Sequence, residues 1–231
     1  MMKFTELRRE AYEANMEIEK QKLAIYTFGN ASAFDPEAGV FAIKPSGVPY
    51  AELSPQAMVL VDLDGKVVEG DLRPSSDTPT HAVLYREFSG VLGITHTHSP
   101  YGVAWAQACE AVPIYGTTHA DHLTEDIPCT EVMRDEAIRN NYEIETGNQI
   151  VQAFRGLNPL EIEMVLVACH GPFAWGKSAW KSVYNAAVLE EIAKMAWLTR
   201  ILRPGTPRLK ESLKRKHYDR KHGKDAYYGQ A

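Results

Sequence analysis

A predicted β-hairpin constrains the fold of this chain more than any other feature of its sequence. Residues 57–70, AMVLVDLDGKVVEG, join an apolar run to a second β-rich run across Asp64-Gly65, a dipeptide typical of tight hairpin turns. A hairpin makes its two strands antiparallel neighbours in a sheet. Other short β-rich segments alternate with helical patterns, without the glycine fingerprint of a dinucleotide-binding fold. We therefore predict one α/β domain over residues 1–231, with a central, mostly antiparallel sheet flanked by helices.

Apolar residues that recur every three or four positions predict the main helices. Residues 3–22 show this spacing, and residues 178–202 show it most strongly. A shorter helix is expected around residues 145–156. Ser99 and Pro100 predict the start of another helix, because serine caps helix N-termini and proline fits the first helical position.

Composition excludes several classes of protein. The 231 residues are 45% hydrophobic and 24% charged, with a formal net charge of −5. These values are ordinary for a soluble globular protein and argue against nucleic-acid binding. No run approaches the ~20 apolar residues that cross a bilayer, and the charged start lacks the apolar core of a signal peptide. The three cysteines form no C-x-x-C pair, so we expect a reducing, cytoplasmic location without a disulfide framework.

Two histidines follow an apolar run in residues 91–100, VLGITHTHSP. Side chains alternate along a strand, so Leu92, Ile94, His96 and His98 would share one face. Imidazoles that continue an apolar face are costly to bury unless something is bound to them. Cα atoms two residues apart on a strand lie roughly 6.5–7 Å from each other, and imidazoles at that spacing can converge on one metal ion.

His170 is the best third candidate for such a site. It follows the predicted strand of residues 164–168 and precedes GPFAWG, which we interpret as a loop that holds the ring rigidly. Zinc takes three or four nitrogen, oxygen or sulfur ligands, so His96, His98 and His170 form a plausible set. The alternative, that each histidine only caps or packs locally, stays open, because H-x-H also occurs in unrelated folds.

Many motifs, in the same order along the chain, resemble those of the class II aldolase/epimerase family, and most closely its sugar-phosphate epimerases. They include TFGNASAFD, IKPSGV, PSSDTPTH, THTHS, GTTHAD, HGPFAWGK and AYYGQ, and the resemblance covers nearly the whole chain. It implies a class II aldolase-like fold and a small sugar-phosphate substrate. It also implies a homotetramer with sites at the subunit interfaces.

The resemblance implies a Zn²⁺ cofactor held by Asp77, His96, His98 and His170. Related aldolases resemble the segment around Asp77 but carry a glutamate that serves as a base. Aspartate is shorter by one methylene and favours a place near the metal. The residue at this position therefore favours an epimerase over an aldolase.

The implied activity interconverts L-ribulose 5-phosphate and D-xylulose 5-phosphate by breaking and re-forming the C3–C4 bond. Simple deprotonation cannot invert C4, because no adjacent carbonyl would stabilise the anion. By resemblance, Asp121 and Tyr228 handle the C4 hydroxyl proton, with Tyr228 reaching the site from a neighbouring subunit. Two alternatives remain: an aldolase that cleaves a sugar 1-phosphate such as L-fuculose 1-phosphate, and a non-catalytic interaction domain like that of adducin.

A phosphate monoester is bound by backbone N–H groups, small hydroxyls and a cation. Three segments of the chain offer these groups, and each alone is an ordinary turn. In the family they converge on the substrate phosphate. The substrate-binding residues implied in this way are Gly29, Asn30, Ser46, Gly47, Ser75 and Ser76, with Lys44 as a weaker candidate.

Two features stand outside the family pattern. His122-Leu123 replaces the aromatic residues that commonly follow the catalytic aspartate, and Pro100-Tyr101 replaces a variable pair. Either departure could change the preferred sugar. The basic stretch 208–224 contains acidic residues as well, so we expect a solvated helix beside an anionic substrate rather than a nucleic-acid surface.

Overall fold

Seven strands form one antiparallel sheet in the computed structural model, which describes residues 4–228. The strand order is β4-β3-β2-β1-β5-β7-β6, and every neighbouring pair is antiparallel, as predicted. The strands are β1 (Asn30–Asp35), β2 (Val40–Ile43), β3 (Val59–Asp62), β4 (Val67–Glu69), β5 (Gly93–His96), β6 (Met164–Val167) and β7 (Gly171–Gly176).

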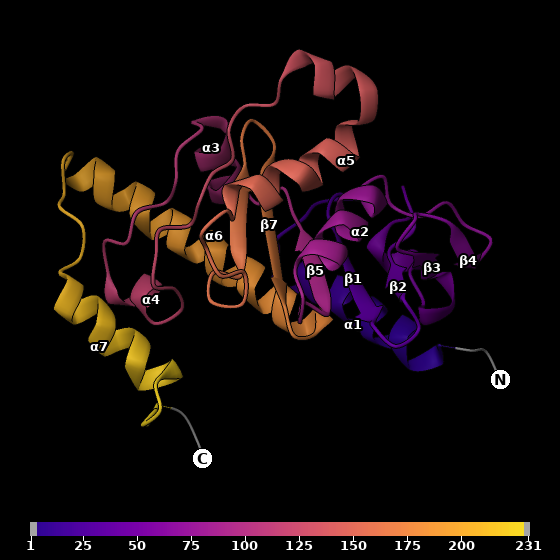
Figure 1. The fold of residues 1–231 in the computed structure, drawn as a ribbon, viewed down its shortest axis with the longest axis horizontal. Coiled ribbons are helices and arrows are strands. Elements are labelled where there is room, and N and C mark those ends of the chain that lie inside the picture. The colour runs from indigo at the N-terminus through magenta and orange to yellow at the C-terminus, as the bar shows by residue number, and fades with distance from the viewer. Residues whose placement is uncertain (1–3, 229–231) are drawn as a thin grey trace.

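Seven α-helices accompany this sheet in the described part of the chain, and α7 packs against α4 at a distance from the strands (Figure 1). They are α1 (Thr5–Lys20), α2 (Thr78–Glu87), α3 (Pro100–Gln107), α4 (Thr117–Ala120), α5 (Asp135–Ala153), α6 (Ala179–Leu202) and α7 (Glu211–His222), with short 3₁₀ turns at Tyr50–Glu52 and Pro55–Ala57. None of the helices searched over residues 4–228 is both long enough and apolar enough to span a lipid bilayer.

Side chains alternate between the two faces of the sheet along β1 and β5, and their contacts place α1 and α6 on one face and α2 on the other. On one face, Asn15 of α1 donates to the Ala31 carbonyl, and Thr95, which pairs with Ala31 across the strands, hydrogen-bonds Ser182 of α6. On the other face, Ser32 of β1 hydrogen-bonds two side chains of α2. The central strands therefore form a buried middle layer, whereas β4 at the edge of the sheet is mostly exposed.

Local sequence signals predicted several elements correctly. The hairpin of β3 and β4 turns at Gly65, whose φ of 82° suits glycine. The helices expected over residues 3–22 and 178–202 are α1 and α6. The helix that follows Ser99 is α3, with Pro100 at its first turn, although the Ser99 side chain makes no capping hydrogen bond.

Two predictions were wrong in extent or type. The helix expected around residues 145–156 is α5, which begins at Asp135 and contains a break at Asn141. The GPFAWG segment is not a loop but the strand β7, between β5 and β6. The glycines of this strand allow close packing: a Cβ at Gly176 would lie 2.5 Å from Lys181 Cγ.

Candidate metal centre

Three histidines converge at one edge of the central strands. His96 ends β5, His98 follows two residues later, and His170 lies in the turn between β6 and β7. One ring nitrogen from each lies within 4.8 Å of the others, and the Nε2 atoms of His96 and His98 are 3.0 Å apart. Of residues 4–228, these three form the one group of this kind that could hold a metal ion. The strand β5 ends earlier than expected, but the two imidazoles still converge.

Contacts on the far side of the rings orient two of these ligands. His96 Nδ1 lies 2.9 Å from the Pro172 carbonyl oxygen, and a donor at Nδ1 leaves the Nε2 lone pair free for a metal. The His96 ring also stacks on Phe173, with the centroids 4.2 Å apart. The Tyr142 hydroxyl lies 3.3 Å from His170 Nδ1. These contacts fix the orientation of the His96 and His170 rings.

The environment of the histidines favours the neutral form that binds metals. Burial, followed by the charge of His96, lowers the pKa of His170 to about 4. Burial likewise lowers the pKa of His98. At neutral pH both rings therefore keep a lone pair for coordination.

Asp77 lies just before α2 and lines the same cavity as the histidines. Its carboxylate accepts a hydrogen bond of 2.6 Å from Asn30 Nδ2. Burial alone would raise the pKa of Asp77, but the charge of His96 and other nearby groups hold it below its usual value. The side chain is therefore an ionised carboxylate beside the three imidazoles, although it lies outside the 4.8 Å group that they form.

The cavity that contains these ligands has a volume of about 520 Å³. Every residue predicted from the sequence to bind phosphate lines it. The lining residues shared with that prediction are Gly29, Asn30, Lys44, Ser46, Gly47, Ser75 and Ser76. The structure thus brings the predicted metal ligands and phosphate-binding groups together in one pocket.

Three of the phosphate candidates, Gly29, Lys44 and Asn30, have a backbone or side-chain environment that suits their residue type. Gly29 has a φ of 73°, and a Cβ there would lie 3.0 Å from the His96 carbonyl oxygen. Lys44 is buried, and its ammonium donates to the Thr27 carbonyl oxygen at 3.1 Å. Burial lowers its pKa. Asn30 Oδ1 is buried without a hydrogen-bond partner, so the pocket holds an acceptor ready for a bound group.

Sequence reasoning missed Tyr142 as a cavity residue. It is the first residue after the break in α5, at Asn141, and its hydroxyl contacts His170. A single tyrosine on a helix carries no signal of contact with a histidine 28 positions away. Only the packing of α5 over the cavity reveals it.

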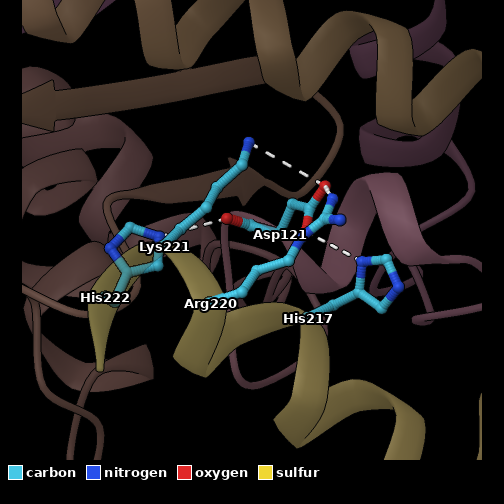
Figure 2. Close-up of polar contacts among 5 residues, drawn as sticks. All are labelled: Asp121, His217, Arg220, Lys221 and His222. Atoms are coloured by element: carbon cyan, nitrogen blue, oxygen red, sulfur yellow. Dashed lines mark hydrogen bonds and ion pairs between the residues drawn. The ribbon is translucent and has the colours of Figure 1, made fainter. Parts of the chain in front are cut away.

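Asp121 lies elsewhere, at the end of α4. Its carboxylate accepts hydrogen bonds from Arg220 Nε at 2.9 Å, from a terminal nitrogen of Arg220 at 2.6 Å and from His217 Nδ1 at 2.9 Å. Lys221 Nζ is 3.8 Å from the carboxylate, and His222 contacts the Asp121 carbonyl oxygen at 3.1 Å. Figure 2 shows these five residues, which we call the Asp121 cluster.

Tyr228 lies against the same cluster. The cations of Arg220 and Lys221 are 4.8 Å and 4.6 Å from the centre of its ring. The structure therefore brings the two predicted catalytic residues, Asp121 and Tyr228, to one place. Neither is among the described residues that line the histidine cavity of the same protomer, and the residues of the two sequence departures do not line it either.

The chain matches the family described as Class II Aldolase and Adducin N-terminal domain over residues 9–197, and it belongs to this family. It is similar to the L-ribulose-5-phosphate 4-epimerase UlaF of Salmonella paratyphi A, with 48% identity over 97% of this chain and 98% of the relative. The protein of the same name from Salmonella typhi matches equally well. These findings confirm the family resemblance.

Solved structures confirm the fold. An L-fuculose 1-phosphate aldolase superposes with a TM-score of 0.80 over 93% of this chain and 95% of that protein, at 24% identity. The L-fuculose-1-phosphate aldolase of Thermus thermophilus superposes with a TM-score of 0.67 over 86% of this chain and 97% of its own, at 23% identity. At these identities the likeness concerns the fold alone, which is the class II aldolase-like fold that we predicted.

Proposed function

We propose that this protein is a zinc-dependent sugar-phosphate 4-epimerase that interconverts L-ribulose 5-phosphate and D-xylulose 5-phosphate. The observation that carries the proposal is the single cavity in which three oriented imidazoles and a carboxylate lie beside phosphate-binding groups. The similarity to relatives named L-ribulose-5-phosphate 4-epimerase supports the choice of substrate.

The proposed zinc ligands are His96, His98 and His170, with Asp77 as the fourth. Three nitrogens and one carboxylate oxygen are a donor set typical of zinc in enzymes. When bound, the ion supplies a Lewis acid that stabilises the negative charge left when the C3–C4 bond breaks.

The rest of the cavity is proposed to hold the substrate by its phosphate. Backbone N–H groups around Gly29 and Gly47 and the hydroxyls of Ser46, Ser75 and Ser76 would surround the phosphate oxygens. The free Oδ1 of Asn30 would accept a hydrogen bond from a substrate hydroxyl instead. The two-carbon aldehyde fragment that carries the phosphate would stay anchored there after cleavage. It could then turn its carbonyl and rejoin on the other face, which inverts C4.

Asp121 and Tyr228 are proposed to move the C4 hydroxyl proton, one on each side of the fragment. Because neither lines the cavity of its own protomer, we propose that a neighbouring subunit of a homotetramer supplies them. Tyr228 has an exposed fraction of 59%, which supports its availability to another subunit. The active site would then be complete only in the assembly.

We further propose that residues 1–231 form one class II aldolase/epimerase domain that works in the cytoplasm. The free thiols of Cys109, Cys129 and Cys169 support a reducing compartment.

The decisive experiment measures D-xylulose 5-phosphate formed from L-ribulose 5-phosphate by the purified protein. We expect activity that disappears after thorough chelation and returns when Zn²⁺ is added. Full activity in the chelated, metal-free protein would contradict the proposal.

A second assay separates an epimerase from an aldolase. An epimerase keeps both fragments until they rejoin, whereas an aldolase releases free aldehyde. We expect no aldehyde to accumulate from L-ribulose 5-phosphate or from L-fuculose 1-phosphate in the presence of an aldehyde-trapping reductase. Steady release of aldehyde from L-fuculose 1-phosphate would identify an aldolase instead.

A further inference from the structure

Two cysteines far apart in the sequence lie side by side at the surface. Cys109 follows the end of α3, and Cys169 lies in the turn between β6 and β7, directly before His170. Their sulfur atoms are 3.6 Å apart, and both residues are exposed. Neither residue has a part in the proposed epimerase chemistry, so the contact needs a separate explanation.

The backbone around this pair is held in place by a shared acceptor. The N–H groups of Cys109 and Cys169 donate to the same carbonyl oxygen, that of Ala106, at 3.0 Å and 2.8 Å. Both cysteines also have left-handed backbone angles, with φ of 54° and 60°. Glycine or asparagine adopts such angles more readily than cysteine, yet cysteine occupies both positions.

We infer that Cys109 and Cys169 are a redox modification site, at which a reversible disulfide ties the turn carrying His170 to the end of α3. Disulfide sulfurs lie about 2.05 Å apart, so the two atoms need to approach by only about 1.5 Å. Rotation of the two exposed side chains supplies that movement, while the shared carbonyl keeps both backbones docked.

The oxidant that the site would take is a small disulfide such as oxidised glutathione. One protein thiolate attacks a glutathione sulfur, which forms a mixed disulfide and releases one glutathione thiolate. The second protein thiolate then attacks the mixed disulfide and releases the other glutathione. Two cysteine thiols are oxidised, one glutathione disulfide is reduced to two thiols, and the two protons pass to the released thiolates.

The third cysteine provides a matched control. Cys129 is half-buried, so a small disulfide reaches its sulfur less readily than the two exposed sulfurs. It should therefore not take part in the exchange.

The effect on the cavity rests on the proposed zinc site. Because Cys169 precedes His170, the disulfide would restrict the movements by which this imidazole leaves the ion. We expect the oxidised protein to release Zn²⁺ several-fold more slowly than the reduced protein.

The first experiment treats the full-length protein with oxidised glutathione at pH 8 and measures free thiols, intact mass and cross-linked peptides. We expect the wild type and Cys129→Ser to lose two thiols, without a glutathione adduct, and to yield a peptide linking Cys109 to Cys169. Cys109→Ser and Cys169→Ser should form no internal link. A stable glutathione adduct on the wild type, no reaction, or a link through Cys129 would overturn the inference.

The second experiment loads the protein with Zn²⁺ and follows its transfer to a chromophoric chelator. Slower transfer from the oxidised wild type, with no change between redox conditions in Cys109→Ser, is expected. Equal rates in a wild type that is linked would overturn the restraint on His170. If no form of the protein binds Zn²⁺, the proposed function fails, while the peptide link still decides whether the disulfide forms.

Discussion

The histidine cavity and the Asp121 cluster are built in opposite ways. The cavity lies on central strands: β5 is paired on both sides, with β1 and with β7, and His96 has an exposed fraction of only 2%. The Asp121 cluster joins the four-residue helix α4 to α7, which has no buried residue. One region is held by sheet pairing and core packing, and the other mainly by ion pairs.

This difference shows which part of the site a single protomer can prepare. Sheet hydrogen bonds and close packing hold side chains within a narrow range of positions. Ion pairs near the surface contribute little stability and can be exchanged for other partners. Under the proposed function, one protomer therefore prepares the metal and phosphate site, while the Asp121 cluster takes its final contacts in the assembly.

The largest expected effect comes from His96→Asn, which removes a ligand from the rigid region. We expect epimerase turnover to fall by at least about 10³-fold, because a metal Lewis acid supplies several kcal/mol of transition-state stabilisation. Zinc content, circular dichroism and turnover should be measured together. His122→Asn is the control, because His122 does not line the cavity, and it should keep its zinc. Loss of the fold, or full zinc content, in His96→Asn would contradict the assignment.

Tyr228→Phe tests the other region. We expect turnover to fall about 10²- to 10⁴-fold, as for the loss of a general acid or base, while zinc binding is unchanged. If the tyrosine acts in the neighbouring subunit, mixed oligomers of Tyr228→Phe and His96→Asn subunits should regain part of the activity. Some of their sites would combine an intact histidine cavity from one subunit with an intact Tyr228 from the other. Mixed oligomers as inactive as their parents would place Tyr228 and the cavity in one subunit or remove Tyr228 from catalysis.

A smaller effect is expected from Tyr142→Phe, which removes the contact to His170 Nδ1. Groups that orient metal ligands typically contribute about 10- to 100-fold to metal affinity or activity. We expect zinc affinity to fall within this range, as measured by competition with a chelator. Tyr26→Phe is a suitable control, because Tyr26 is 82% exposed and does not line the cavity. Unchanged affinity in Tyr142→Phe would show that the cavity orients His170 without it.

The smallest effect should come from the ion pairs of α7. Arg220→Gln removes two hydrogen bonds to Asp121, so amide hydrogen exchange in α7 should become faster. Arg215→Gln breaks only an exposed pair with Glu211 and should leave exchange nearly unchanged. Equal exchange in both variants would show that Arg220 does not hold α7 against α4.

The same contact has a predictable pH dependence. Burial acts to raise the pKa of Asp121, but hydrogen bonds from Arg220 and His217 hold it below its usual value. A carboxyl group with a lowered folded-state pKa stabilises the folded state above its unfolded pKa, about 3.9, and this contribution is lost as the pH falls through the folded value. We expect α7 to remain docked at neutral pH and to exchange faster only in acid. Release between pH 6 and 7 would assign the contact to another group.

Local sequence alone determined a large part of this protein. The hairpin, α1, α6 and the start of α3 follow from turn residues, apolar spacing and the place of proline in the first helical turn, which act within a few positions of the chain. His96 and His98 also follow from local spacing, since an imidazole on an apolar strand face is costly unless it is bound. The motifs around Asp77, His170 and the phosphate candidates were recognisable by resemblance, and the fold brings them into one cavity.

The tertiary structure alone decided what depends on distant segments. The GPFAWG segment is a strand because β5 and β6 lie on either side of it, and these neighbours outweigh its glycines. Tyr142 meets His170, and Cys109 meets Cys169, across 28 and 60 positions. Asp121 forms an ion pair with Arg220 of the basic helix α7 and does not line the cavity. Such contacts depend on how the elements pack, and periodicity within a short window carries no information about that packing.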